Sequence, residues 1–245
     1  MRTFLFLFLL VFPKLVFSFE VVLLFGPPGS GKGTFAQCAK EKGYEHISAG
    51  DLVRDEVARK TEIGLAIEEL VRKGEYINPV VMFQLVQDRA LACVAKNHSF
   101  IIDGYGRTAS DAARLREFLR EIKAPGRVFF LDASDATCKE RILNRLVCPC
   151  CFSIYNRNMG YQIESLCTNC HNAHLEVRLN DTPQVIEKRL KQYREEIEPC
   201  YRAFLVELPA ISYNTDRDLQ SCLAYYNALL DGWAVLQIKI CAQNF

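Results

Sequence analysis

The stretch that decides the fold is VVLLFGPPGSGKGT, residues Val21–Thr34, in which an unbroken apolar run leads into a glycine-rich loop with one lysine. Residues 21–25 are β-branched or large and apolar without alternation, which predicts a strand covered on both faces of a parallel sheet. The glycines allow backbone amides to approach an anion, and Lys32 adds a positive charge. A helix that starts near residues 31–34 points its positive dipole end at the same place. The stretch therefore predicts a polyphosphate-binding loop.

The loop departs from the strict phosphate-loop pattern at one position. That pattern places serine or threonine directly after the lysine, whereas here Gly33 follows Lys32 and Thr34 comes next. A glycine-rich turn without a ligand is the alternative interpretation. The preceding strand and the lysine disfavour it.

The composition is that of a globular chain able to bury a full core. Of 245 residues, 50% are hydrophobic and 24% are charged, and the formal net charge is +1. A charge this small argues against a nucleic-acid surface, because binding to a phosphate backbone usually requires a basic excess. We expect no nucleic-acid partner, no stable membrane association and a monomer.

The amino-terminal residues leave two localisations open. An apolar run at Phe4–Phe12 follows Arg2 and is too short to span a bilayer, and Val16 and Ser18 fit the cleavage site of a secretory signal. Cleavage there would leave the mature chain starting almost inside its first strand, and free thiols suit a reducing interior. We predict a cytoplasmic protein with residues 1–19 as an apolar extension. An exported or organellar protein is the alternative.

Apolar runs and amphipathic segments alternate along the rest of the chain. Strands are expected at 46–49, 100–102, 128–131 and 210–213, and helices include 138–146, 182–197 and 219–230. Gly26, Asp103 and Asp132 fall at the carboxyl ends of strands, where open α/β sheets bind ligands. The expected fold class is α/β, with a doubly wound parallel sheet in three layers. Residues 232–245 have no assignment.

The window 147–177 interrupts this alternation with cysteine, aromatic and asparagine residues. It contains two C-x-x-C knuckles, formed by Cys148, Cys151, Cys167 and Cys170, and this spacing is a strong signal for tetrahedral zinc. Four thiolates leave no open coordination position, so we expect a structural Zn²⁺ that holds an insert too small for its own core. Fortuitous knuckles or a redox pair are the alternative, and Cys150 and His171 are nearby substitute ligands.

Arginines flank the insert on both sides. Arg141 and Arg145 are four apart and are expected to share one face of the helix that leads into the insert, and Arg178 and Arg189 follow its exit. Phosphoryl transfer asks the protein mainly for positioning and cationic donors, with Mg²⁺ bridging the donor phosphates. An insert between such arginines would close over a nucleotide and exclude water.

These motifs together resemble adenylate kinase, and more narrowly its long form with a zinc-bearing lid. The motifs are GPPGSGKGT at 26–34, HISAGDLVR at 46–54, DGYGRT at 103–108, the two cysteine knuckles and RLNDTPQVIEKRL at 178–190. The resemblance implies the P-loop nucleoside monophosphate kinase fold in three parts. These are a core at 20–146 and 178–231, an acceptor-binding flap at 48–77 within it, and a zinc lid at 147–177.

The resemblance also implies an activity, the reversible Mg²⁺-dependent transfer of a phosphoryl group from ATP to AMP, giving two ADP. By carry-over, the ATP site consists of Gly29, Ser30, Gly31, Lys32, Gly33, Thr34, Arg141, Arg145, Ile154 and Tyr155. The AMP site consists of Ala49, Arg54, Glu75, Tyr76, Ile77, Gly104, Tyr105, Gly106, Arg107, Asp111, Arg178 and Arg189. The cations expected at the transferred group are Lys32, Arg107, Arg145, Arg178 and Arg189. Asp103 would orient Mg²⁺ through water.

The departures from the family concentrate in the acceptor site. Ala49, Gly106 and Asp111 stand where the family usually has threonine, proline and glutamine. Alanine removes a hydroxyl donor, and an ionised aspartate accepts hydrogen bonds but does not donate them. A kinase with another acceptor, UMP or CMP, is therefore the nearest alternative. A non-catalytic ATP-binding zinc module is the alternative from a different class.

Overall fold

The computed structural model describes residues 19–73, 77–124, 126–204 and 208–242. Residues 1–18 of the predicted extension, and the flap residues Glu75 and Tyr76, lie outside the described residues. Phe19, which the sequence analysis assigns to the extension, is buried in the core and its ring packs against Phe100 at a centroid distance of 6.2 Å.

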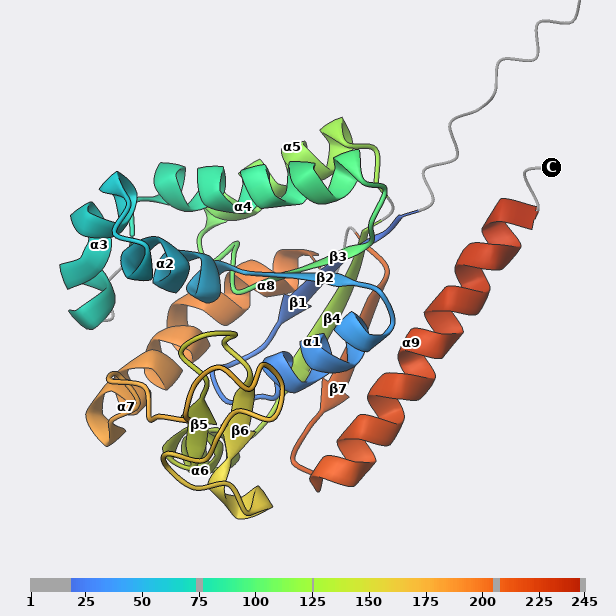
Figure 1. Ribbon diagram of the computed structural model, residues 1–245. Coiled ribbons are helices and arrows are strands. Elements are labelled where there is room, and N and C mark those ends of the chain that lie inside the picture. Colours follow the sequence, from blue (N-terminus) through green and yellow to red (C-terminus); the bar gives the residue numbers. More distant parts are fainter. Residues whose placement is uncertain (1–18, 74–76, 125, 205–207, 243–245) are drawn as a thin grey trace, which may run out of the picture.

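A five-stranded sheet forms the middle layer of the molecule (Figure 1). All its neighbouring strands are parallel, in the order β2 (Glu45–Ser48), β3 (Phe100–Asp103), β1 (Val21–Phe25), β4 (Gly126–Asp132) and β7 (Ala210–Asn214). In β1, residues 21, 23 and 25 face one core and residues 22 and 24 face the other, so the whole strand is buried. The parallel α/β fold expected from the sequence is confirmed.

Helices cover both faces of this sheet. The first core is completed by α4 (Pro79–Ala95), α5 (Ala109–Glu121) and α8 (Glu198–Phe204). The second is completed by α1 (Lys32–Glu41) and α9 (Leu219–Ala242), and Figure 1 shows this pair on the side of the sheet away from α4 and α5. In the second core the ring of Phe35 packs on Phe129 and Tyr226, with centroids 4.6 and 5.3 Å away.

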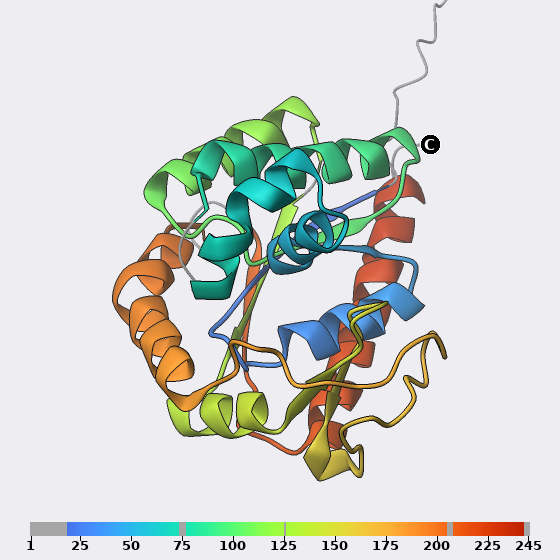
Figure 2. The same ribbon diagram turned by 60° about the vertical axis from the view of Figure 1, so that its left-hand side comes forward.

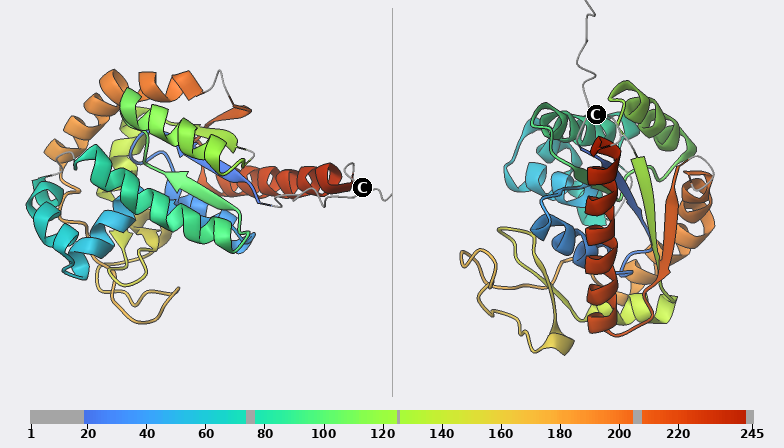
Figure 3. Two further views of the ribbon diagram at one scale, coloured as in Figure 1. Left: turned by 90° about the horizontal axis from the view of Figure 1, so that it is seen from above. Right: turned by 90° about the vertical axis from the view of Figure 1, so that its right-hand side faces the viewer.

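The last helix is longer than the sequence pattern indicates. The predicted helix ends at residue 230, whereas α9 continues to Ala242 and takes in most of the unassigned segment. Seen from above, α9 reaches well beyond the sheet (Figure 3). Cys222, Tyr226 and Leu230, in its first half, are buried in the second core.

The predicted flap consists of α2 (Ala49–Ala58) and α3 (Glu62–Lys73), and leads into the start of α4. Ser48 caps α2 by accepting a hydrogen bond from the amide of Asp51 at 3.2 Å. The two helices meet at Gly64, where an added Cβ would overlap the backbone of Glu56. Only glycine lets them approach this closely.

In the sequence, the lid lies between two helices, α6 (Asp135–Leu143) and α7 (Pro183–Gln192). Cys138 and Ile142 of α6 pack with Ile186 and Leu190 of α7 in a small cluster of their own. The helix predicted at 182–197 is continuous with α7, and its last turn, Tyr193–Ile197, widens to a π-helix.

The helix predicted at 138–146 is wrong at its carboxyl end. The α6 helix stops at Leu143, and Arg145 instead starts β5 (Arg145–Val147), which pairs antiparallel with β6 (Ile154–Asn156). Arg141 and Arg145 therefore do not share a helix face. Pairing with Asn156 outweighs the local helical pattern at Arg145.

Candidate nucleotide-binding site

A cleft of about 940 Å³ opens at the carboxyl ends of the strands. The flap helices, the lid and α7 all contribute residues to its lining, and Figure 2 shows these elements around one end of the sheet. Of the predicted nucleotide-binding residues that the structure describes, all except Ser30 line this cleft, and the four predicted zinc ligands lie outside it in the lid. Ser30 belongs to the loop, but its side chain is buried. Its carbonyl oxygen accepts a hydrogen bond from the Thr215 hydroxyl at 3.0 Å.

The loop after β1 has a backbone that requires glycine. Gly26, Gly29 and Gly31 have φ angles of 147°, 86° and 91°. An added Cβ at Gly29 would lie 2.6 Å from the carbonyl oxygen of Cys138, so the loop also packs too tightly for a side chain. Helix α1 starts at Lys32 with Gly31 as its N-cap and no side-chain cap. Its first amides are therefore available to an anion.

Lys32 is held over this loop by its own backbone. The ammonium donates to the carbonyl oxygens of Gly26 and Pro27, both at 2.8 Å. Burial lowers the pKa of Lys32 to about 8, although the nearby Asp103 carboxylate acts in the opposite direction. A bound polyphosphate would give this ammonium a negatively charged partner and would favour its protonated form.

Asp103 ends β3 beside the loop and pairs with His46 of β2, whose Nε2 lies 3.3 Å from the carboxylate. Burial opposes ionisation of Asp103, but the contact with His46 and the charge of Lys32 bring the pKa of the carboxyl below its usual value. His46 was not predicted as a site residue. It begins the HISAGDLVR motif and lies in β2, the strand next to β3.

Two arginines on the acceptor side of the cleft are fixed by local contacts. The Arg107 Nε donates to the carbonyl oxygen of Gly104 at 2.9 Å. Arg54 forms an ion pair with Asp51 one turn earlier in α2. Both guanidinium groups line the cleft.

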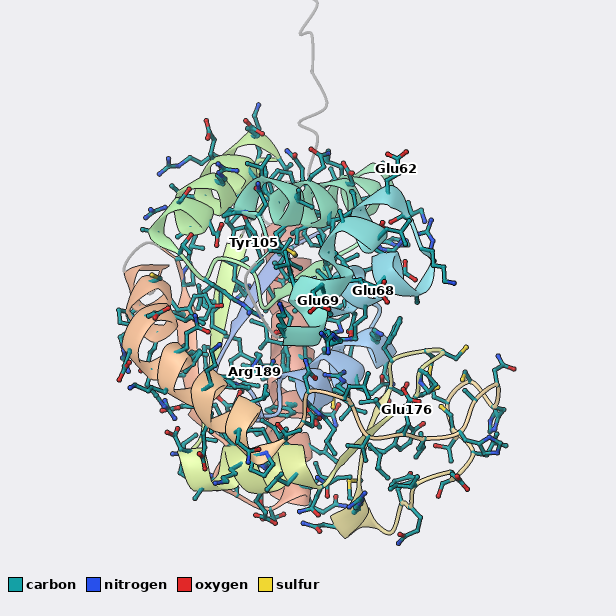
Figure 4. The ribbon with its side chains drawn as sticks, turned by 90° about the vertical axis from the view of Figure 1, so that its left-hand side faces the viewer. Glu62, Glu68, Glu69, Tyr105, Glu176 and Arg189 are labelled. Atoms are coloured by element: carbon teal, nitrogen blue, oxygen red, sulfur yellow. The ribbon has the colours of Figure 1, made fainter. Side chains whose placement is uncertain are left out.

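Two further arginines are partly buried among other cations. Burial, together with the charges of Arg145 and Arg54, lowers the pKa of Arg178 to about 9. Burial and the charges of Arg107 and Arg145 lower the pKa of Arg189 to about 10. Figure 4 shows Arg189 on α7, away from the outline of the molecule in this view. Such crowding of like charges is unfavourable unless an anion joins them.

The remaining two arginines, Arg141 and Arg145, are held by hydrogen bonds at the base of the lid, where the chain enters it. Arg145 donates through Nε and a terminal nitrogen to both oxygens of Asp181, at 2.8 and 2.6 Å. Arg141 donates to the hydroxyl and carbonyl oxygens of Thr215, at 3.1 and 2.6 Å, and so ties α6 to the loop after β7. Neither Asp181 nor Thr215 was predicted from the sequence.

The two cysteine knuckles come together in the lid. The sulfur atoms of Cys148, Cys151, Cys167 and Cys170 all lie within 4.8 Å of one another. Hydrogen bonds hold this cluster: the Tyr155 hydroxyl contacts the Cys167 sulfur at 3.1 Å, and the Asn169 amide nitrogen contacts Cys151 at 3.4 Å. Despite burial, the Tyr155 hydroxyl and the backbone amides of Cys170 and Asn169 lower the pKa of Cys167 to about 6. Cys150 is exposed and lies outside the cluster.

The lid also touches the phosphate loop directly. An added Cβ at Gly33 would lie 2.5 Å from Cδ1 of Ile154 in β6. The position at which the strict loop pattern has serine or threonine is thus covered by an apolar side chain of the lid. Figure 4 shows Glu176 in the lid, and its backbone forms an isolated antiparallel bridge with Val147.

The sequence model of the family described as adenylate kinase matches residues 24–206 of this chain. The chain belongs to the adenylate kinase family. It is 37% identical to the adenylate kinase of Chlamydia felis over 70% of this chain and 79% of that protein. It is 35% identical to the Chlamydia pneumoniae enzyme over 82% and 93% of the two chains, and 34% identical to that of Kosmotoga olearia over 82% and 94%.

The match to adenylate kinase begins inside β1 and ends after α8, so it includes the phosphate loop, the flap and the lid. β7 and α9 follow it in the same sheet and core. In the described part of the chain, no helix combines the length and apolar character needed to cross a membrane.

Proposed function

We propose that this protein is an adenylate kinase that reversibly transfers the terminal phosphoryl group of Mg²⁺-ATP to AMP. The observation that carries the proposal is the convergence of Lys32, Arg107, Arg145, Arg178 and Arg189 on one cleft with a glycine-rich loop. Phosphoryl transfer requires little covalent chemistry from the protein. It requires donor and acceptor in line and cations around the transferred oxygens.

On the donor side, the amides of residues 29–34 and the Lys32 ammonium would hold the ATP phosphates. The loop is already shaped for this by its glycines and by the uncapped start of α1. Arg141 is immobilised against Thr215 at the lid's base, where its guanidinium would pack on the adenine. Ile154 and Tyr155 would cover the nucleotide from the lid.

On the acceptor side, Arg54 and Arg107 would bind the phosphate of AMP. Arg178 and Arg189, whose pKa values are lowered by burial among cations, would bind the group in transit. Closure of the flap and lid over these groups would exclude water and so prevent hydrolysis of ATP.

Magnesium would lie near Asp103, whose carboxylate stands next to Lys32 at the end of the phosphate loop. A carboxylate with a lowered pKa is the type of group that holds this hard cation through its water shell. When bound, Mg²⁺ neutralises charge on the donor phosphates. His46 holds the Asp103 side chain in place for that role.

Zinc fits the cysteine cluster of the lid. Four sulfur atoms within 4.8 Å of one another, supported by hydrogen bonds, suit tetrahedral coordination of Zn²⁺, which would leave no position for substrate. The ion would therefore be structural. It would hold a lid whose own core contains only a few buried residues, among them Leu146, Tyr155 and Leu175.

We further propose a cytoplasmic monomer with the three parts expected from the sequence: the core, the flap at 48–77 and the lid at 147–177. The support for a reducing location is chemical, since the structure holds ten free cysteines among its described residues. Fractionation of cells and size-exclusion chromatography with light scattering test these two statements.

A coupled assay tests the activity. ADP should form from ATP plus AMP, and a panel with UMP and CMP decides between the acceptors. Lys32→Met should lower kcat by about 10² to 10³, the loss typical for one donor to a developing charge. Unchanged turnover of the variant, or a preference for UMP or CMP over AMP, would contradict the proposal.

A further inference from the structure

One short hairpin of the lid carries both a wall of the cleft and half of the cysteine cluster. Its strands β5 and β6 pair side by side (Figure 1). All three residues of β6, Ile154, Tyr155 and Asn156, line the cleft. The loop between the strands holds the first knuckle, Cys148 and Cys151, and both belong to the cluster. The cleft and the cluster are therefore only a few residues apart on one element.

Tyr155 connects this hairpin to the second knuckle. Its hydroxyl lies 3.1 Å from the Cys167 sulfur and 3.2 Å from the Thr168 hydroxyl, and it accepts a hydrogen bond from the Asn169 amide at 3.2 Å. These three residues belong to the knuckle that ends at Cys170. One side chain thus joins a strand at the cleft to the other half of the cluster.

Packing holds the side chain of Tyr155 in this position. The residue is 8% exposed and belongs to the small core of the lid. It lies opposite Leu146 in the strand pairing, and its ring packs edge-on against that of Tyr161 at a centroid distance of 4.7 Å. Because packed interiors transmit displacements, a phenol confined in this way cannot shift at one end without a shift at the other.

The chemistry of the hydroxyl suits a sulfur that binds a metal. A cysteine ligand is a thiolate, which accepts hydrogen bonds, and a phenol is protonated at neutral pH and can donate. Hydrogen bonds of this kind orient the ligands, and their loss typically weakens metal affinity by about 10- to 100-fold. The Tyr155 hydroxyl is placed to make such a contact with Cys167.

We propose that Tyr155 is a positioning residue that couples the metal cluster of the lid to the donor nucleotide. ATP bound against β6 fixes the tyrosine, and the tyrosine hydroxyl holds Cys167 in its ligating position. Coupling between two binding sites is reciprocal, so ATP and Zn²⁺ raise each other's affinity by the same factor. The inference rests on the proposed function, since it takes ATP as the donor and Zn²⁺ as the metal.

Two variants of the full chain test the coupling. Tyr155→Phe removes the hydroxyl and keeps the ring. Tyr161→Phe is the matched control, because it removes a phenol from the neighbouring ring of the same small core. Competition with a chromophoric chelator under reducing conditions measures zinc affinity, with and without ATP in excess Mg²⁺. Calorimetry measures ATP binding to the zinc-loaded and zinc-free forms of each protein.

In the wild type, ATP should raise zinc affinity about tenfold, a moderate value for two coupled sites, and zinc removal should weaken ATP binding by the same factor. In Tyr155→Phe, zinc affinity without ATP should fall about tenfold, and ATP should change it by less than about twofold. Tyr161→Phe should match the wild type in both measurements. Free ATP also binds zinc, but that competition lowers the apparent zinc affinity and so cannot produce the expected rise.

Equal effects of ATP on the zinc affinity of the wild type and of Tyr155→Phe would show that the hydroxyl does not connect the two sites, and would overturn the proposal. No effect of ATP in the wild type, or an equal loss of coupling in Tyr161→Phe, would overturn it as well. If the wild type binds ATP and zinc but forms no ADP from ATP and AMP, the proposed function fails. The two affinities then still decide the coupling by the same comparison.

Discussion

Arg145 and Asp181 close the base of the lid with two parallel hydrogen bonds, at 2.8 and 2.6 Å, between the strand that leads into the lid and the turn that follows it. The Asp181 side chain is fully buried and that of Arg145 is 13% exposed. The pair therefore joins the two chain segments that enter and leave the lid, and it holds Arg145 at the cleft.

Replacing Asp181 with alanine should lower the free energy of unfolding by about 3 kcal/mol, because a buried guanidinium loses its partner. Glu187→Ala is the matched control, since it breaks an exposed ion pair with Lys139 and should cost less than about 1 kcal/mol. Urea denaturation of both variants measures the difference. Equal costs would show that Asp181 does not anchor the lid.

Lys32 should make stability depend on pH in the alkaline range. Its pKa is about 8 in the folded protein and 10.5 in the unfolded chain, so the unfolded chain holds the extra proton between these values. Stability then rises with pH across this window, by up to about 3 kcal/mol, as the cost of burying the ammonium disappears. The difference between wild type and Lys32→Met, measured from pH 7 to 11, isolates this contribution. A difference that does not vary with pH would show that the lysine is not perturbed.

Gly29→Ala should disrupt the phosphate loop through both backbone and space. The residue has a φ of 86°, and its new Cβ would lie 2.6 Å from the Cys138 carbonyl oxygen. Gly43→Ala is the control, because Gly43 has a φ of 88° but nothing within 4 Å of the added Cβ. We expect Gly43→Ala to cost about 1 kcal/mol of stability, from the backbone alone, and Gly29→Ala to cost more and to abolish ATP binding. Calorimetry with ATP and thermal unfolding test this, and similar behaviour of the two variants would refute it.

The lid should carry one zinc ion per chain. Cys148→Ser should lose the metal, whereas Cys150→Ser should retain it because Cys150 is exposed and outside the cluster. Metal analysis by mass spectrometry gives the stoichiometry of each variant. Removing zinc with a chelator should lower the melting temperature of the wild type. A wild type that is purified with reduced thiols and without metal would exclude the assignment.

The sheet and the phosphate loop could be predicted because their signals are local. The buried run of β1, the glycines after it and Lys32 lie within a few residues of one another, and the structure places them as expected. The cysteine cluster was predictable for a similar reason, since each knuckle is a short motif. The β5–β6 hairpin carries the first knuckle, and the bridges Leu166–His174 and Val147–Glu176 bring the second knuckle beside it.

The anchors of the site were not predictable, because they join distant segments. Arg141 donates hydrogen bonds to Thr215, 74 positions away in the sequence. His46 of β2 contacts Asp103 of the neighbouring strand β3. No local pattern marks such partners. The error in the predicted end of α6 has the same origin. Arg145 has a helical sequence context, and it belongs to a strand only because it pairs with Asn156.

The lid has a small core of its own, with Leu146, Tyr155 and Leu175 packed around the cysteines, separate from the two cores of the sheet. Exchange of this segment between relatives, cut just before Arg145 and just after Val177, would leave both faces of the sheet intact. Evolution could therefore vary the length and chemistry of the lid independently of the core. The condition is that Asp181 is kept, so that it can pair with the arginine at position 145 of the exchanged segment.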